Sequence, residues 1–340
     1  MFARVVVLNP PRCTAEDYIQ FPLATPRVAT ATEAARAQPD RPAAPAHDAL
    51  PRLLTRPGPD PAALWQEVRP LLRLPGGWLV LDDSTPDKPH ARHMSLVCRH
   101  WSGNPYEVVD GINLIGLAWS DGDRLYPTDY RVSHKAADGK TKDDHFRDPL
   151  AGARARGSRP RGVPSDGWYA GLENLKAVRG YGWVFLARLA ASRAVRPDRQ
   201  PPRPAGALPI SASGTAAWLP GFGMVKVFRI VATDGDTRHW VTNDLGMGEP
   251  TRPQFAEQSW AVGEYHRGLK QYTGADRCRC RAARARRHHI GCALRALARL
   301  GWHRFTTGVS WFGAKFRIVR EAVRHYLEQP LHRLPQPRTA

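Results

Sequence analysis

The stretch Gly76–Thr85, GGWLVLDDST, decides how the rest of the chain is interpreted. Its apolar run from Trp78 to Leu81 has the length and composition of a buried β-strand. The run ends in two adjacent carboxylates, Asp82 and Asp83. Because side chains alternate across a strand, these two point to opposite faces of the sheet. The stretch therefore predicts a buried strand that presents acidic groups at its end.

A second segment, residues 162–189, reads GVPSDGWYAGLENLKAVRGYGWVFLARL. It places Asp166 in a loop, then a helix over Leu172 to Val178, then a strand over residues 183–189. A strand, loop, helix and strand in this order are typical of an α/β sheet. Carboxylates that converge from separate elements are ligands that Mg²⁺ prefers, and paired ions of this kind activate water and stabilise a leaving oxygen. Acidic residues at strand ends are also common as solvated turn formers, so residue types alone leave both interpretations open.

The regions on either side of these segments differ in composition. Residues 1–74 hold short helical stretches broken by Pro, the last beginning with Asp60 as N-cap and Pro61 at the first helical position. We expect a small helical N-terminal region there. Residues 75–195 should form the first part of the core, and 196–252 an insertion with a Pro/Gly-rich loop and β-strands. Residues 253–330 should be the helical remainder of the core, and 331–340 a tail.

The overall charge favours a polyanionic partner. Lys and Arg total 50 against 31 Asp and Glu, a net charge of +19, and every phosphate contact made by such side chains releases a counterion. A GC-rich genome, which over-uses Arg, is the alternative explanation. The five cysteines are odd in number and show no paired framework, which favours a reduced compartment. We find no run of about 20 apolar residues and no secretory signal, so we expect a soluble cytoplasmic protein without membrane contact.

A third segment, WAVGEYHRGLKQ, spans Trp260 to Gln271 and has helical character. It carries Glu264, His266, Arg267 and Lys270 within about two turns. One residue along a helix is about 100° around its axis, so neighbouring side chains leave from different faces. Side chains seven residues apart return to one face, which pairs position 263 with Lys270.

Together these motifs resemble the DDE transposases of bacterial insertion sequences, of the cut-and-paste type. The closest likeness is to the branch that carries the DDST strand and the EYHRGLKQ helix. The resemblance runs in order from about Ala15 to Pro330 and includes several separate long motifs, which makes it more specific than one short pattern.

The resemblance implies an α/β fold with a ribonuclease-H-like catalytic core, a β-rich insertion and a small helical N-terminal region. It also implies an Asp, an Asp and a Glu that bind two Mg²⁺ (or Mn²⁺) ions, nick DNA by hydrolysis and direct the freed 3′-OH to a target. The first Asp matches Asp83 and the second Asp166. The implied partners are double-stranded DNA, both terminal inverted repeats and target DNA, bound by a homodimer that is nucleoid-associated when on DNA. The helical N-terminal region, residues 1–74, could then bind the DNA ends.

The third carboxylate departs from the family pattern. The position of the Glu, two residues before the aromatic Tyr265, is occupied by Gly263. Ser259 and Ala256 stand where the family carries Arg and Tyr, whereas Lys270 fills its position. Glu264 is the remaining candidate for the third catalytic and metal-binding residue, although it should leave from another helix face. The alternative is an impaired remnant that only binds DNA.

Basic residues in and after this helix are the candidate DNA contacts, with a solvated charged face as the alternative. A zinc site from the cysteines and histidines of residues 278–292 fits no common finger spacing. For the aromatic residues near the site, Trp168, Tyr169 and Trp260, core packing is favoured over stacking on a distorted DNA base. The candidate DNA-binding residues are Trp260, Arg267, Lys270, Arg277, Arg281 and Arg284, with Arg286 in the same basic stretch.

Overall fold

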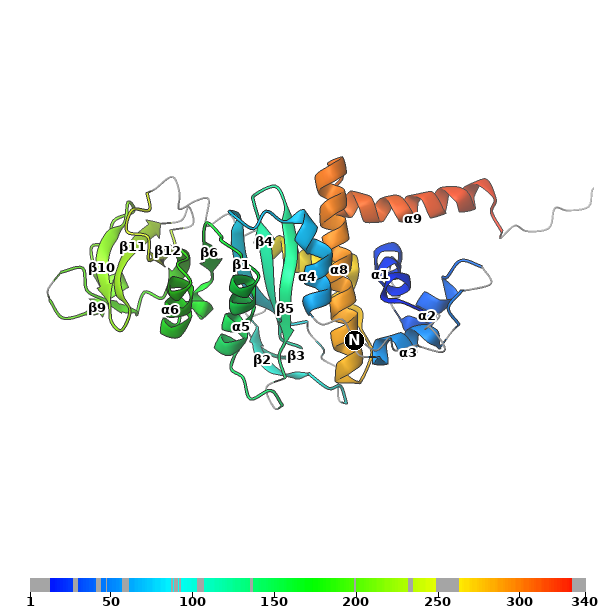
Figure 1. The fold of residues 1–340 in the computed structure, drawn as a ribbon, viewed down its shortest axis with the longest axis horizontal. Helices are drawn as coiled ribbons and strands as arrows, with labels where there is room; N and C mark the ends of the chain where they lie inside the picture. Colours follow the sequence, from blue (N-terminus) through cyan, green and yellow to red (C-terminus); the bar gives the residue numbers. More distant parts are fainter. Residues whose placement is uncertain are drawn as a thin grey trace, which may run out of the picture.

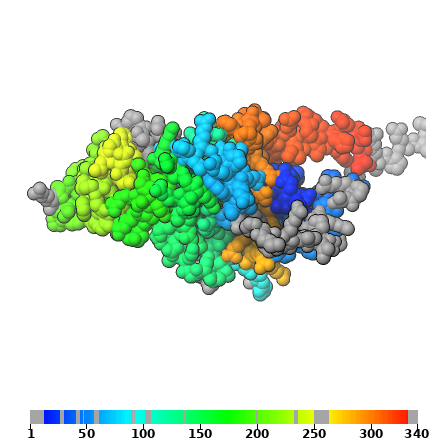
Figure 2. Space-filling model, in the orientation of Figure 1, coloured from blue at the N-terminus to red at the C-terminus, as the bar shows by residue number. Residues whose placement is uncertain are grey.

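The computed structural model describes residues 13–331, with gaps at 27–29, 41–43, 47, 57–60, 87, 89–90, 92, 103–106, 135–136, 199, 232–234 and 249–262. The molecule is elongated, with short N-terminal helices at one end, a β-sheet core in the middle and an inserted group of strands at the other end (Figure 1). These parts form one continuous body in the space-filling view (Figure 2). Among the described helices, none combines the length and apolar character needed to span a bilayer.

The N-terminal unit consists of short helices that pack on a long C-terminal helix. Its elements are α1 (Ala15–Ala24), α2 (Ala31–Arg36), α3 (Ala49–Thr55), α4 (Pro61–Val68) and the 3-10 turn η1 (Arg69–Leu71). Helix α1 starts where the Asp17 carboxylate accepts a hydrogen bond from the Thr14 backbone N–H, which satisfies an otherwise unpaired donor. Tyr18 meets His289 of helix α8 (Ala283–Thr307) at 2.7 Å between hydroxyl and Nδ1. This buried polar contact joins the N-terminal unit to the core.

Three antiparallel strands form the first half of the central sheet: β1 (Trp78–Ser84), β4 (Leu114–Ser120) and β5 (Leu125–Val132). The predicted buried strand at Trp78 to Leu81 is confirmed. The register pairs Asp82 with Gly116 and Asp83 with Ile115. A separate hairpin, β2 (Cys98–Ser102) and β3 (Glu107–Gly111), connects β1 to β4.

The second half of the sheet runs parallel to β1. Parallel bridges join Trp78 to Gly162 and Pro75 to Arg159, next to β6 (Val163–Ser165), which pairs in parallel with β7 (Phe185–Leu189). The strand order across the core is therefore β5, β4, β1, β6, β7. Helices α5 (Lys142–Ala155) and α6 (Leu172–Gly180) and the turn η2 (Gly167–Tyr169) lie in the connections. Since β1 and β6 are parallel, their carboxyl ends lie at the same edge of the sheet. The α/β class expected from the sequence is confirmed.

The inserted strands extend the sheet beyond β7. Strands β8 (Ala194–Val195) and β9 (Arg203–Pro204) form a small ribbon, followed by the turn η3 (Ala205–Ala207). Strands β10 (Thr215–Leu219), β11 (Gly223–Val231) and β12 (Thr237–Thr242) form an antiparallel group, and β12 pairs with β7. Trp78 and Val80 of β1 pack with Phe228 of β11, so the insertion shares an apolar cluster with the core.

The C-terminal part is helical and returns to the sheet. Residues 263–273 are helical and are followed by η4 (Ala275–Arg277), α8 and α9 (Trp311–Glu328). A Cβ at Gly116 would lie 3.0 Å from the Tyr265 hydroxyl, so this glycine lets helix 263–273 approach the sheet closely. A Cβ at Gly268 would lie 2.5 Å from the Trp311 ring, which places the same helix against α9. The helix therefore packs between the β1–β4 pair on one side and α9 on the other.

Candidate active site

Asp83, at the end of β1, is held by side chains from three other segments. The Asn113 amide donates to its Oδ2 at 2.9 Å, and the Tyr169 hydroxyl donates to its Oδ1 at 2.8 Å. The Lys142 ammonium group, in the first turn of α5, lies 2.6 Å from the same Oδ1. Both oxygens of this carboxylate are thus engaged, and its charge is compensated by a lysine.

Asp166 follows β6 and is the N-cap of η2. Its Oδ1 accepts hydrogen bonds from the backbone N–H groups of Trp168 at 3.0 Å and Tyr169 at 3.3 Å. Burial first, and then the negative charge of Asp83, raise the pKa of Asp166 above its ordinary value. The cap therefore holds Asp166 near Asp83, and Tyr169 of the same turn connects the two by donating to Asp83.

Asp82 leaves the opposite side of β1, toward helix 263–273. Its Oδ2 lies 3.8 Å from Nε2 of His266, a residue of that helix. Burial, followed by the charges of Asp83 and Asp166, raises the pKa of Asp82 to about 7. Burial, followed by the charge of Lys270, lowers the pKa of His266 to about 4. His266 is buried, whereas the Asp82 side chain is partly accessible, and the three aspartates form one electrostatically coupled group.

The first turn of helix 263–273 contributes no carboxylate to this group. Gly263 is exposed, and a Cβ built there would meet nothing within 4 Å. The Glu264 carboxylate lies 3.9 Å from the Arg304 guanidinium of α8, and its side chain is 46% exposed. The structure thus brings Asp83 and Asp166 together and leaves Glu264 paired elsewhere.

A two-metal centre was the expectation, and the described residues supply only part of the ligands for one. Within the described ranges, no three His, Cys, Asp or Glu side chains are grouped so as to hold a metal ion. Asp83 and Asp166 supply two carboxylates, but Lys142, Tyr169 and Asn113 already engage both oxygens of Asp83. Two metal ions need more oxygen ligands than this arrangement offers.

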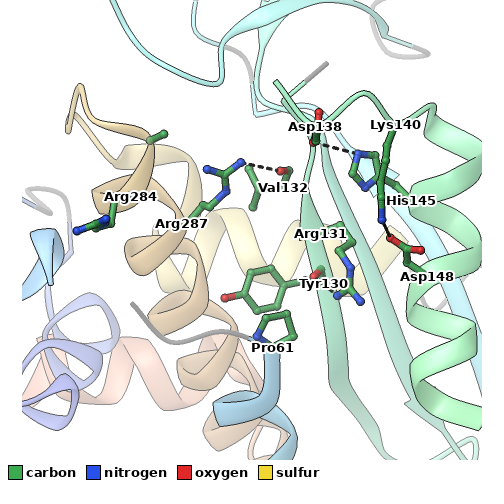
Figure 3. A pocket seen from close by; sticks show the side chains of 11 residues that line it. Pro61, Tyr130, Arg131, Val132, Asp138, Lys140, His145, Asp148, Arg284 and Arg287 are labelled. Atoms are coloured by element: carbon green, nitrogen blue, oxygen red, sulfur yellow. Dashed lines mark hydrogen bonds and ion pairs between the residues drawn. The ribbon is translucent and has the colours of Figure 1, made fainter. Parts of the chain in front are cut away.

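Two neighbouring hollows contain basic side chains, and the smaller one lies beside the site. One, of about 560 Å³, is bordered by Arg99, Lys140, Lys142 and Trp168 among others. The second, of about 630 Å³, lies between β5, α5 and the start of α8, with Arg284 and Arg287 on the α8 side (Figure 3). Lys140 borders both hollows. Lys140 and Lys142 are ion-paired with Asp148 and Asp83, and Asp138 and Asp148 also border the second hollow.

The predicted DNA-binding residues differ in how exposed they are. Arg267, Arg281 and Arg284 are exposed, and Lys270 is half-buried. Arg277 donates to the carbonyl of Pro26 at 3.2 Å, which gives it a structural contact. Trp260, with Ala256 and Ser259, lies outside the described residues.

One arginine of the basic stretch was predicted wrongly. Arg286 is fully buried, and its Nε donates to the Cys280 carbonyl at 2.6 Å, so it cannot contact DNA phosphates in this fold. The preceding residues 278–282 are not helical, and α8 begins at Ala283. The periodicity of the sequence did not show where this helix starts. The start at Ala283 decides which face Arg286 occupies, and that face is buried.

Several site residues were missed or misjudged from the sequence. Tyr169 is buried as expected, but its hydroxyl serves Asp83. Trp168 is 58% exposed, so core packing was the wrong interpretation for it. Lys142 and Asn113 were not singled out, because only the fold brings them to β1. The one local signal was that Lys142 follows Thr141, an N-cap, and so occupies the first helical position of α5.

Comparisons with known proteins do not assign this chain to a family. No protein-family model matches the chain, and no curated protein matches it. Among solved structures, the chain is similar to a piggyBac transposase in a synaptic complex with hairpin DNA, solved by cryo-EM. The TM-score is 0.41 at 11% identity, over 76% of this chain and 55% of that chain. The chain thus spans about half the length of this neighbour, and a likeness of this size does not establish a common fold.

Proposed function

We propose that the chain is a transposase-like DNA-binding protein whose catalytic centre is incomplete. The observation that carries the proposal is that two carboxylates lie together at the strand ends, whereas the helix contributes none to them. Asp83 and Asp166 are coupled at the ends of β1 and β6. Position 263 carries no side chain, and Glu264 pairs with Arg304. This arrangement supports a site in which two of the three carboxylates implied by the resemblance are present and the third is missing.

The strand order supports a ribonuclease-H-like core. Strand β4 is antiparallel to both β5 and β1, whereas β1, β6 and β7 run parallel. In this mixed sheet, Asp83 lies at the end of β1 and Asp166 directly follows the neighbouring strand β6. Strands β8 to β12 lie between Asp166 and helix 263–273, the place that the resemblance assigns to an insertion.

DNA binding is supported by charge and by its distribution. The net charge is +19, and the hollow of about 560 Å³ is bordered by Lys142 and Asn113, which contact Asp83. Arg281 and Arg284 at the start of α8 add exposed cations. Each side chain that neutralises a phosphate releases a counterion, so binding should weaken steeply with salt. The proposed partner is double-stranded DNA, both inverted repeats and target, bound by a homodimer.

The alternative is an active enzyme in which Glu264 completes a Mg²⁺ or Mn²⁺ centre with Asp83 and Asp166. For this, Glu264 would have to leave Arg304 and turn by about 100° around the helix axis to reach the direction of position 263. His266, three residues after 263, already points to Asp82, so position 263 has the better direction. The geometry favours an incomplete site over this alternative.

The test compares the chain with its Gly263→Glu variant, and with Gly263→Gln as the matched control of equal size without the charge. Duplexes that carry the ends of the encoding DNA element are incubated with Mg²⁺ or Mn²⁺, and nicks are counted on sequencing gels. We expect all three proteins to bind DNA with a strong salt dependence and only Gly263→Glu to nick it. Nicking by the unaltered chain would establish the enzyme alternative, and absence of DNA binding at low salt would overturn the proposal.

A further inference from the structure

Cys278 and Cys280 lie two residues apart in the short segment between η4 and α8. Residues 278–280 form neither helix nor strand, and the backbone at Cys278 is extended, with φ −61° and ψ 124°. Side chains two residues apart in an extended chain leave from the same face. The Cys278 thiol accordingly donates a hydrogen bond to the Cys280 sulfur. Cys278 is buried and Cys280 is partly exposed, so the second sulfur is the one open to a reagent from solvent.

Arg286, near the start of α8, is a buried cation that faces these two sulfurs. Its Nε donates to the Cys280 carbonyl at 2.6 Å, and its Nη2 contacts the Met94 sulfur. Its Nη1 has no hydrogen-bond partner among the residues that the structure describes. Burial lowers the pKa of Arg286, and the charges of the Cys278 and Cys280 sulfurs raise it. A buried guanidinium is costly unless an anion accompanies it, and Cys280 supplies that anion when it is a thiolate.

The hydrogen bond and the guanidinium give the two thiols different reactivity. The bond donated by Cys278, and then the charge of Arg286, lower the pKa of the Cys280 thiol, although burial opposes them. The same bond, followed by burial, raises the pKa of the Cys278 thiol. The thiolate is the attacking species in disulfide exchange. Cys280 is therefore placed to attack first, and Cys278 to attack second.

The other cysteines of the chain do not combine exposure with such surroundings. Burial raises the pKa of the Cys13 thiol to about 11 and that of the Cys292 thiol to about 12, and both side chains are buried. Cys98, on β2, is partly exposed like Cys280 and provides the internal comparison.

We propose that Cys278 and Cys280 form a reversible thiol–disulfide pair that reacts with low-molecular-weight disulfides. The Cys280 thiolate attacks one sulfur of the reagent, which forms a mixed disulfide and releases one thiolate. Cys278 then loses its proton and attacks the Cys280 sulfur, which closes the disulfide between the two cysteines and releases the second thiolate. The cysteine pair loses two electrons, the reagent gains them, and the proton of Cys278 passes to a released thiolate.

The backbone allows this disulfide, and the buried arginine makes it easy to reduce. Two residues of extended chain span about 6.6 Å, and the Cα atoms of bridged cysteines usually lie about 4.4–6.8 Å apart. Oxidation removes the thiolate that faces Arg286 and leaves its charge buried without an anion. A disulfide whose reduced form is the better stabilised state belongs to the labile, regulatory kind. It directly precedes Arg281 and Arg284, the exposed cations at the start of α8.

The first measurement is the rate at which iodoacetamide alkylates each cysteine of the folded protein at pH 7, followed by mass spectrometry. We expect Cys280 to react at least about fivefold faster than Cys98, because more of it is thiolate. Arg286→Met keeps the length of the side chain and removes its charge, so it should lower the Cys280 rate to about that of Cys98.

The second measurement treats the folded protein with oxidised glutathione, alkylates the remaining thiols in denaturant and determines the intact mass. The unaltered chain should lose two of its five alkylatable thiols and retain no glutathione, and dithiothreitol should restore both. Cys278→Ser should stop at one retained glutathione, because the second attack is removed. Cys280→Ser should lose the reaction, and Cys98→Ser, the matched control, should behave like the unaltered chain.

Equal alkylation rates for Cys280 and Cys98, or five free thiols after treatment with oxidised glutathione, would overturn the thiol–disulfide pair. Glutathione retained by the unaltered chain would contradict the second attack by Cys278. The serine variants exchange one sulfur for one oxygen each, so they decide the matter even where Arg286→Met does not fold. Neither measurement uses DNA, so its outcome is independent of the function proposed above.

Discussion

The strand edge at β1 and β6 and the first turn of helix 263–273 are the two halves of the candidate active site, and they are built differently. At the strand edge, Asp83 has three side-chain partners and Asp166 caps a turn. In the helix, Gly263 and Glu264 are exposed, and open space surrounds the missing side chain. A carboxylate can therefore be absent from the helix without disturbing the fold, whereas changes at the strand edge should destabilise it.

The largest effect is expected from Tyr169→Ala at the strand edge. This substitution removes a buried ring that stacks on Phe146 at 4.6 Å between centroids and takes a hydrogen-bond donor from Asp83. We expect the free energy of unfolding to fall by about 3–5 kcal/mol, as for other buried aromatic truncations. Denaturation in urea at pH 7 measures this. A loss below about 1 kcal/mol would mean that the strand edge is not the rigid half.

The second prediction concerns the well-anchored end of helix 263–273. His289 Nε2 lies 2.9 Å from the carbonyl of Gly274, directly after this helix, and burial lowers the pKa of His289 from 6.5 to about 4. Because the depressed pKa belongs to the folded state, the stabilisation is fully present above pH 6.5 and is lost as the pH falls toward 4. The loss at pH 4 should be about 3 kcal/mol from this residue.

The matched variant for this prediction is His289→Gln, which keeps polar atoms but cannot take up the proton. The free energy of unfolding is measured for both proteins at pH 7, 6, 5 and 4. Other buried histidines, including His266, are the same in both, so their effects cancel in the difference. Parallel pH curves for the two proteins would contradict the prediction.

A smaller effect is expected at Asp166. Asp166→Asn keeps an acceptor for the Trp168 and Tyr169 N–H groups and removes a charge that is repelled by Asp83, whereas Asp166→Ala loses the cap. The Ala variant should be about 1 kcal/mol less stable than the Asn variant. Thermal unfolding of the two variants side by side gives the difference, and equal stability would show that the cap contributes nothing.

The smallest effect is expected at Glu264. Its pair with Arg304 is exposed on both sides, with 46% and 49% of the side chains accessible. We expect Glu264→Gln to change the free energy of unfolding by less than about 0.5 kcal/mol. In the nicking assay the substitution should leave the activity of Gly263→Glu unchanged. Loss of that activity would mean that Glu264, and not position 263, belongs to the site.

The local sequence was sufficient to predict strand β1 and the opposite directions of Asp82 and Asp83. The apolar run before Asp82 predicted β1, and the alternation of side chains predicted that Asp82 and Asp83 diverge, as Lys142 and His266 on their two sides show. It was not sufficient for Trp168 or Arg286, whose exposures were opposite to expectation. The exposure of one bulky side chain depends on which element packs over it, and residue type does not contain that information.

The sequence by itself determined the strand that carries Asp83, the basic character of the chain and the glycine at position 263. These follow from composition and local periodicity, which act over a few residues. Only the tertiary structure decided that Lys142, Tyr169 and Asn113 converge on Asp83, that Glu264 turns to Arg304 and that Trp168 faces a basic hollow. These contacts join residues up to 86 positions apart, such as Tyr169 and Asp83, so the packing of the elements sets them.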